Sequence, residues 1–235
     1  MNEAISEALK ARRITRLCHF TPSRNLQHIA AGRIGVLSTA SLQGEERAAF
    51  NQTDLERLDG RTTHICCSIE FPNAWYFDKA RSKEKLFPDW VVLLISPQYL
   101  TQDGTLFCPR NAAAQYGRHI VEGFDGFNSV FAPTVTGTGN VKRSRNQLHR
   151  SSCPTDEQAE VLIYDRVLLS DLIGVAVASE EQARTERARL RVNGVDPDQF
   201  RFVIAPQMFD KYALSKVIRD GHGADEELYQ PPAAK

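Results

Sequence analysis

Apolar and polar residues alternate in short blocks along the first part of the chain. Residues 2–12 have apolar positions at helical spacing and predict a short amphipathic helix. The block ITRLCHFT at residues 14–21 predicts a buried strand that contains one histidine. A second helix should follow, with Thr21 as its N-cap and Pro22 at its first position.

Two continuous apolar runs predict strands in the middle of the chain. They are HICCSI at residues 64–69 and WVVLLIS at residues 90–96. Runs of this kind without polar alternation are typical of strands that are buried on both faces. Both are therefore expected in the core.

The last third combines closely spaced strands with helices. Ser179 and Gln182 form a capping-box pattern at the start of a helix that Gly194 should end. The tail from about residue 221 to residue 235 is polar and is expected to be loosely held. The other predicted elements are strands at 160–165, 172–179 and 200–205 and a helix at 206–219.

The order of these elements indicates the fold class. Short strands and helices are mixed without regular strand–helix–strand repetition, which favours an α+β fold over a doubly wound one. A length of 235 residues suits a single domain over residues 1–235. Residues 129–156 are polar and lack periodicity, so we expect a long loop, and long loops inside compact domains are usually functional or mobile.

Composition restricts the function classes. Hydrophobic residues are 42% and charged residues 25% of the chain, a balance typical of globular proteins. The 29 basic residues equal the 29 acidic ones, so attraction to an acidic partner would have to come from local clusters. Five cysteines without a C-x-x-C pair predict free thiols and no metal site. The polar start and the lack of a membrane-length apolar run favour a cytoplasmic protein.

Glu160 is the strongest local anomaly, because it opens an apolar strand and shares a face with Leu162 and Tyr164. Burial of an unpaired carboxylate costs several kcal/mol. Glu160 is therefore either solvated at a frayed strand end or held there for chemistry. His19 and Thr21 each have a structural explanation as well, as a core histidine and a helix cap.

A basic segment precedes Glu160. It has four Lys or Arg residues within nine positions and no acid, which suits contacts to backbone phosphates, although a solvated loop would look the same. Its candidate DNA contacts are Lys142, Arg143, Arg145, His149 and Arg150.

Two parts of the sequence together resemble the DarT family of DNA ADP-ribosyltransferase toxins. They are CHFTPSRNLQHIAAGRIGVLS near the start and TDEQAEVLIYDRVLLSDLIGVAV near the end. The resemblance extends over roughly residues 14–205. The middle of the chain differs from the sequence motif of the thymidine-modifying members and looks closer to a branch that modifies guanine.

The resemblance implies an ADP-ribosyltransferase fold, with split mixed β-sheets, a cleft for NAD⁺ and flanking helices. Glu160 would be the catalytic glutamate, which binds the ribose 2′-hydroxyl and stabilises an oxocarbenium-like state as nicotinamide leaves. An arginine upstream of the second strand would hold the pyrophosphate and polarise the base. Arg57 is the first choice and Arg61 the alternate.

The resemblance also implies the remaining contacts. Tyr76 or Phe77 would stack on nicotinamide, and the basic loop with Gln158 would bind a single DNA strand. The usual companion of the family is an antitoxin that removes ADP-ribose from DNA. The expected NAD⁺ contacts are His19, Phe20, Thr21, Asn25, Ser68 and Tyr76.

Two other functions fit parts of the sequence. Gln158 and Glu160 form a Q-x-E pattern found in protein-modifying ADP-ribosyltransferases, with Arg16 and Ser68 as possible partners. A non-catalytic nucleic-acid-binding domain would use the same basic segment, but it would leave Glu160 unexplained.

Overall fold

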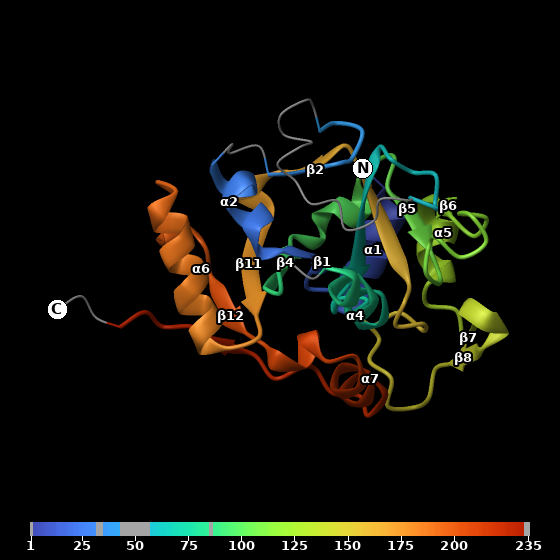
Figure 1. Ribbon diagram of the computed structural model, residues 1–235. Coiled ribbons are helices and arrows are strands. Elements are labelled where there is room, and N and C mark those ends of the chain that lie inside the picture. Colours follow the sequence, from blue (N-terminus) through green and yellow to red (C-terminus); the bar gives the residue numbers. More distant parts are fainter. Residues whose placement is uncertain (1, 32–34, 43–56, 85–86, 233–235) are drawn as a thin grey trace.

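The computed structural model describes residues 2–31, 35–42, 57–84 and 87–232 (Figure 1). Nine of the described strands form one mixed sheet in the order β13-β12-β11-β4-β1-β3-β9-β5-β6. The strands of this sheet are β1 (Leu17–Pro22), β3 (His64–Ile69), β4 (Trp90–Ile95), β5 (Leu106–Cys108), β6 (Val121–Glu122), β9 (Glu160–Tyr164), β11 (Leu172–Val177), β12 (Phe202–Ile204) and β13 (Glu227–Leu228).

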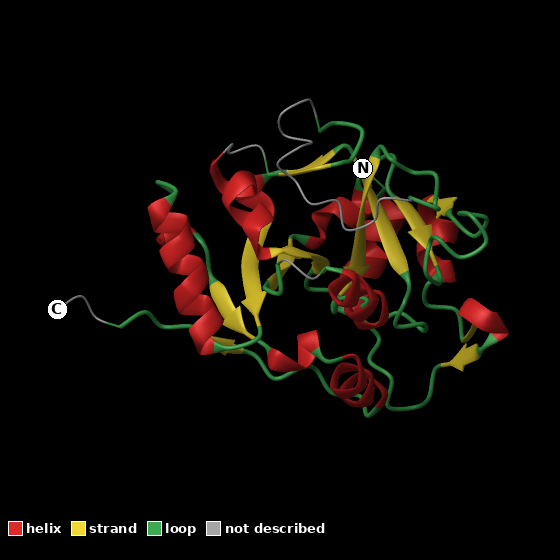
Figure 2. Cartoon of the chain, viewed as in Figure 1, coloured by secondary structure: helices red, strands yellow, loops and turns green. Residues whose placement is uncertain are grey.

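Helices flank the sheet, and two small strand pairs lie beside it (Figure 2). The pairs are β2 (Val36–Leu37) with β10 (Arg166–Val167), and β7 (Thr134–Thr136) with β8 (Lys142–Ser144). The helices are α1 (Glu3–Arg12), α2 (Ser23–Ala31), α4 (Ala74–Lys83), α5 (Gly123–Ser129), α6 (Glu180–Val192) and α7 (Lys211–Arg219).

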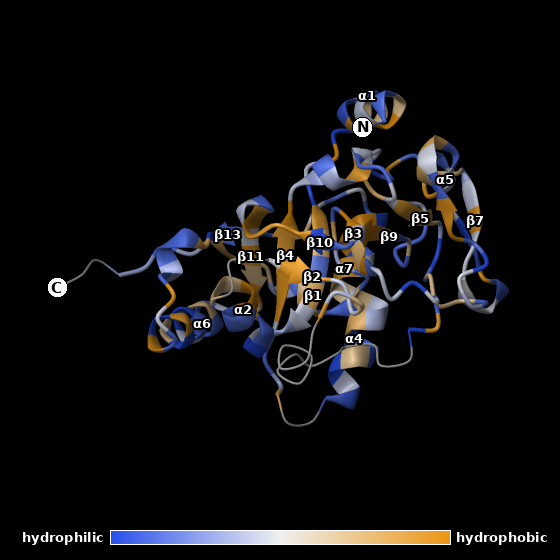
Figure 3. Cartoon of the chain, turned by 90° about the horizontal axis from the view of Figure 1, so that it is seen from above, coloured by the Kyte–Doolittle hydropathy of each residue, from blue (hydrophilic) through white to orange (hydrophobic). Residues whose placement is uncertain are grey.

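The core lies on both faces of the sheet. On β4, Val91, Leu93 and Ile95 pack into the cluster that contains the apolar residues of α1, α2, α5 and α6. Val92 and Leu94 pack on the opposite side with α4 and α7. This alternation follows from the two-residue period of a strand. Figure 3 shows the resulting hydrophobic strands at the centre of the molecule.

The sheet is nearly divided between β1 and β3. β1 pairs with β4 along its whole length, from Leu17 to Pro22. With β3 it pairs only at Leu17↔Ile69 and Cys18↔Ser68, after which the two strands separate. The expected α+β fold with split sheets is thus confirmed in this form, as two half-sheets joined by one short ladder.

Several predicted elements are present close to their expected bounds. The strands at 64–69, 90–96, 160–165 and 172–179 correspond to β3, β4, β9 and β11. The cap of α6 is also as predicted, because the Ser179 side chain accepts a hydrogen bond from Gln182 N. These segments have unambiguous apolar runs or caps.

Three expectations are wrong. Thr21 does not cap α2, because β1 continues through Pro22 against β4 and the helix begins at Ser23. The segment expected to be an unstructured loop contains the β7–β8 hairpin. The tail is not loose over its described part, because β13 pairs with β12 and Tyr229 is buried.

None of the described helices combines the length and apolar character needed to cross a membrane.

Candidate active site

A cavity of about 130 Å³ opens where β1 and β3 separate. Its walls come from β1, α2, β2 and the residues after it, residues 57–59, β3, α4, the turn after β5 and the start of β9. Apolar and polar side chains both line it, and several of the polar ones could take part in binding or catalysis. The lining includes His19, Phe20, Thr21, Asn25, Arg57, Asp59, His64, Cys66, Tyr76, Asn111 and Glu160.

Glu160 lines this cavity from the first position of β9, and only 7% of it is exposed. Its Oε1 accepts hydrogen bonds from Asn73 Nδ2 at 3.0 Å and Asn111 Nδ2 at 3.1 Å. Its Oε2 accepts one from Ala112 N at 3.0 Å. The strand end is not frayed, since Glu160 pairs with Cys108. Hydrogen bonds to a carboxylate are stronger than neutral ones and offset the cost of its burial.

The donors to Glu160 come from two segments that precede it in the chain. Asn73 is the N-cap of α4, and its side-chain oxygen accepts from Tyr76 N while its amide nitrogen donates to Glu160. Asn111 and Ala112 belong to the turn after β5. Sequence reasoning missed all three residues. Asn73 follows Pro72 and directly precedes α4. Asparagine is a preferred N-cap residue, so the sequence could have indicated Asn73 as the cap of this helix.

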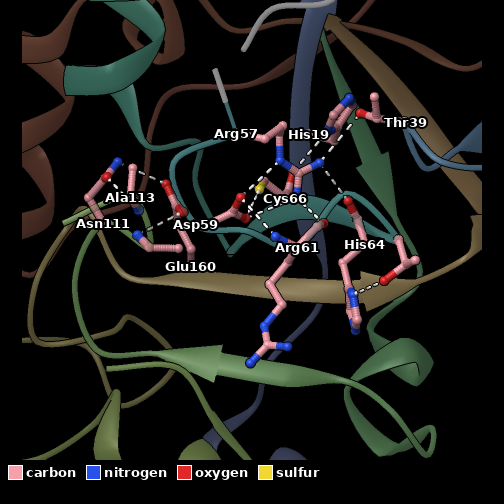
Figure 4. Close-up of polar contacts among 12 residues, drawn as sticks. His19, Thr39, Arg57, Asp59, Arg61, His64, Cys66, Asn111, Ala113 and Glu160 are labelled. Carbon is pink, nitrogen blue, oxygen red and sulfur yellow. Dashed lines mark hydrogen bonds and ion pairs between the residues drawn. The ribbon is translucent and has the colours of Figure 1, made fainter. Parts of the chain in front are cut away.

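Arg57 also lines the cavity and is held by Asp59 (Figure 4). Its Nε donates to Asp59 Oδ1 at 3.0 Å and its Nη2 to Asp59 Oδ2 at 2.9 Å. Its Nη1 donates to the backbone oxygen of His64 at 2.9 Å. Burial opposes ionisation of Asp59, but the hydrogen bonds and charge of Arg57 prevail and hold the pKa of Asp59 below its usual range. The guanidinium therefore has a fixed orientation.

Arg61, the alternate choice, is exposed and does not line the cavity. Figure 4 shows its side chain extending away from Arg57 and Glu160. Of the two arginines, only Arg57 is brought to the site.

His19 spans the gap between the half-sheets. Its Nδ1 lies 2.8 Å from the backbone oxygen of Cys66 on β3. Because a carbonyl oxygen only accepts, Nδ1 carries the proton and Nε2 of the neutral ring is an acceptor. Burial is the main cause of a lowered pKa for His19, with a further contribution from Arg57. The ring is therefore neutral near pH 7.

The other expected NAD⁺ contacts on β1 and α2 also line the cavity. Thr21 Oγ1 accepts a hydrogen bond at 2.8 Å from Nδ2 of Asn25, which lies four residues later on α2. Phe20 stacks on Phe77 with ring centroids 4.6 Å apart. Phe77 is itself almost fully buried, so Tyr76 is the α4 aromatic residue at the cavity.

Ser68 does not reach the cavity. It is buried, and its hydroxyl accepts from Asn73 N at 3.1 Å. Arg16 is also absent from the cavity lining and is bound to Glu226 at 2.5 Å and to the Glu70 backbone. The pair expected for a protein-modifying enzyme is therefore not assembled with Glu160.

The basic segment divides into internal and outward-facing residues. Arg145 donates to the backbone oxygens of Cys153 and Arg150 at 2.8 and 2.7 Å, and His149 Nε2 contacts Pro154 O at 3.0 Å. Both therefore stabilise the segment rather than present free donors. Lys142 is exposed, and Arg143, Arg150 and Gln158 are half-buried.

No group of three or more potential metal ligands occurs among the described residues. All five cysteines are free thiols. Burial, reinforced by the charge of Glu160, raises the pKa of Cys66 well above its usual value.

Comparisons with known proteins identify the family and the fold. A sequence model of the family described as "ssDNA thymidine ADP-ribosyltransferase, DarT" matches residues 18–210. The fold is similar to Thermus sp. 2.9 DarT in complex with carba-NAD⁺, with a TM-score of 0.52 and 13% identity over 79% of this chain and 97% of that one. No curated protein matches in sequence.

Thermosipho africanus DarTG in complex with ADP-ribose is also similar, with a TM-score of 0.50 and 13% identity. The match covers 83% of this chain but 51% of that one, so the chain spans about half the length of that protein. At such identities these two structures support the fold.

Proposed function

The chain belongs to the DarT family of ADP-ribosyltransferases, and we propose that it transfers ADP-ribose from NAD⁺ to a base of single-stranded DNA, with Glu160 as the central carboxylate. The observation that supports this most directly is the position of Glu160. It is a nearly buried carboxylate, oriented by three hydrogen bonds, in a cavity that also contains Arg57 and His19.

The reaction breaks the bond between nicotinamide and C1′ of the ribose and forms a bond from C1′ to a base nitrogen, which releases its proton to solvent. Positive charge develops on the sugar as neutral nicotinamide leaves. A fixed carboxylate in a partly dry cavity stabilises that charge without reorganising, and such electrostatic stabilisation is usually the largest contribution to catalysis. Glu160 carries this charge, and the hydrogen bonds from Asn73 and Asn111 hold its carboxylate in place.

The lining of the cavity suits the groups that a dinucleotide carries. Phe20 and Tyr76 offer aromatic surface for a flat ring, and His19 and Asn25 offer polar atoms for ribose or adenine. Arg57 contributes a cation to the cavity lining, and a pyrophosphate there would lie beside its ion pair with Asp59. We assign NAD⁺ contacts to these residues and exclude Ser68, whose hydroxyl is engaged with the α4 cap.

The direct test is label transfer from NAD⁺ to one oligonucleotide, alone and annealed to its complement. We expect the single strand to be labelled and the duplex to be protected, since extrusion of a paired base costs a few kcal/mol, roughly a hundredfold in rate. Glu160→Gln should reduce labelling by about 10²-fold or more while the melting temperature stays close to wild type. Equal labelling of both DNA forms would rule out the single-strand requirement.

We further propose that the chain is the toxin of a toxin–antitoxin pair, whose antitoxin removes ADP-ribose from DNA. The DarT family assignment and the likeness to a protein named DarTG support this role. Expression in bacteria should stop growth, and an enzyme that hydrolyses ADP-ribosyl-DNA should restore it. Mass spectrometry of the digested product will identify the base, for which the family description names thymidine.

A further inference from the structure

Glu157 connects the segment of residues 142–158, which carries the proposed DNA contacts, to two helices. Only 13% of its side chain is exposed. Its Oε1 accepts a hydrogen bond from Arg219 Nε at 2.9 Å. Its Oε2 accepts one from Trp75 Nε1 at 3.3 Å and one from the hydroxyl of Ser215. Both carboxylate oxygens are therefore engaged by donors of α4 and α7, which lie side by side (Figure 1).

The donors to Glu157 also hold one another. Trp75 Nε1 donates to Ser215 Oγ at 3.1 Å as well as to Glu157, and Ser215 is buried. Arg219 forms the ion pair that compensates the charge of Glu157. Hydrogen bonds that a charged group accepts are stronger than neutral ones, and three of them from two helices fix the direction of the carboxylate. We call Glu157 with these three residues the Glu157 clamp.

The 142–158 segment contacts α7 and the turn after it at a second place. Asn146 Nδ2 donates to the backbone oxygen of Arg219 at 3.1 Å. Gly221, two residues beyond Arg219, has a φ of +81°, and a Cβ added there would clash with the backbone oxygen of Leu148. The segment is thus attached to α7 both near its middle and near its end at Glu157.

Helix α4 joins the clamp to the catalytic carboxylate. Asn73 at its N-cap donates to Glu160 at 3.0 Å, and Trp75, two residues later, donates to Glu157 at 3.3 Å. Tyr76 of the same helix lines the cavity. The first turn of α4 therefore fixes the end of the segment, the catalytic carboxylate and one wall of the cavity relative to one another.

An acid is unusual in a part of the chain that binds DNA. A carboxylate near backbone phosphates repels them, since affinity for DNA comes largely from basic groups. Glu157 directs its oxygens to donors of α4 and α7, and it does not line the cavity. What it supplies to DNA binding is therefore the position of the chain around it rather than a contact of its own.

We propose that Glu157 is a positioning residue that holds the 142–158 segment in place for single-stranded DNA. The inference rests on the proposed function and gives α7 a part in it. Glu160 keeps its orientation without the clamp, because its three donors come from the α4 cap and the turn after β5. Loss of the clamp should therefore weaken the use of DNA and leave the use of NAD⁺ and the catalytic step largely unchanged.

The test is the steady-state rate of label transfer, with the oligonucleotide and NAD⁺ varied in turn. Glu157→Ala should raise the KM for the oligonucleotide on the order of tenfold, because the segment loses its attachment to both helices. The kcat and the KM for NAD⁺ should stay within about twofold of wild type. The direction of the change is informative, because removal of an acid that only repelled phosphates would lower the KM for the oligonucleotide.

Two further variants alter the clamp without changing its charge. Trp75→Phe removes the Nε1 donor and Ser215→Ala removes the hydroxyl, and each should raise the KM for the oligonucleotide about threefold. Trp75→Phe added to Glu157→Ala should have little further effect, because both act on one network. Glu180→Gln is the matched control, since the ion pair of Glu180 with Arg184 lies within α6, and it should leave all three constants unchanged.

Two failures are distinguishable. If the wild type labels the single strand but Glu157→Ala leaves the KM for the oligonucleotide unchanged, lowers it, or raises both KM values alike, the positioning role is wrong and the proposed function stands. If Glu157→Ala does not fold, wild-type KM values in both Trp75→Phe and Ser215→Ala lead to the same conclusion. If the wild type labels no single-stranded DNA under any condition, the proposed function and the positioning role are both overturned.

Discussion

At the scale of single residues, the site depends on how a buried charge is held. Glu160 accepts hydrogen bonds from two asparagine side chains and one backbone amide. Asparagine suits this task because its amide nitrogen donates while its oxygen remains available for a second contact. Asn73 uses both ends, one for Glu160 and one for the cap of α4.

Asn73→Asp should separate these two roles. Aspartate keeps the cap of α4, but position 73 is only 2% exposed, so a second carboxylate beside Glu160 should also lower the melting temperature. It cannot donate to Glu160 and adds a like charge, so the rate of label transfer should fall about tenfold or more. Asn2→Asp is the matched control, because Asn2 caps α1 in the same way away from the cavity. A wild-type rate for Asn73→Asp would mean that this hydrogen bond does not position Glu160.

His19 should make stability depend on pH. Its pKa in the folded protein lies below the usual value of 6.5 because of burial. As pH falls below about 6.5, the unfolded chain takes up a proton that the folded protein refuses, so stability is lost. Above that pH the histidine contributes nothing to this dependence.

Thermal unfolding between pH 7.5 and 5.5 measures the effect. His19→Asn should retain the hydrogen bond to Cys66 O and remove part of the slope. The lowered pKa values of His64, His119 and His149 contribute in the same direction. His222→Asn, an exposed substitution, serves as the comparison. An unchanged slope in His19→Asn would show that His19 titrates normally.

At the scale of elements, the C-terminal segment is part of the sheet. β13 pairs with β12, and Glu226 just before it binds Arg16 just before β1, at 2.5 Å. Arg16 is largely buried, and Glu226 is the acid that neutralises it. The ion pair therefore joins the C-terminal segment to the start of the chain, because Arg16 and Glu226 lie 210 positions apart in the sequence.

Removal of this contact should destabilise the fold without touching the cavity. Glu226→Ala leaves the Arg16 guanidinium without its carboxylate, which costs about 1–3 kcal/mol. Glu227→Ala, the exposed next residue, should cost much less. Urea unfolding of the two variants gives the comparison. Equal free energies of unfolding would show that the ion pair contributes no more than a surface charge.

At the scale of the whole molecule, the half-sheets meet at a short ladder and diverge around the cavity. A ligand that contacts His19 on β1 and Glu160 on β9 joins the two halves. Binding to the folded state alone stabilises it, by about 2.7 kcal/mol at a ligand concentration a hundredfold above Kd.

NAD⁺ should therefore raise the melting temperature, by roughly 5–10 °C for a chain of this size. Thr21→Ala, which alters the cavity wall at β1, should reduce this increase at the same NAD⁺ concentration. Arg184→Gln, remote on α6, should show the full increase. An identical increase in Thr21→Ala would place the ligand elsewhere.

The sequence by itself determined the segments whose local signals are strong. The apolar runs that became β3, β4 and β9 and the Ser179 cap of α6 follow from periodicity and capping, which depend on neighbouring residues only. It also singled out Glu160, because a carboxylate at the mouth of an apolar strand is unusual wherever the strand lies.

Only the tertiary structure decided which residues surround that carboxylate. Asn73 and Asn111 lie 87 and 49 positions from Glu160 in the chain, and no local pattern relates them. The same holds for Arg145, whose charge suggested a phosphate contact but whose donors are used by backbone oxygens of its own segment. Sequence specifies which groups can donate or accept, whereas the folded chain fixes which partners come within hydrogen-bond distance, because those contacts form only after distant strands have paired.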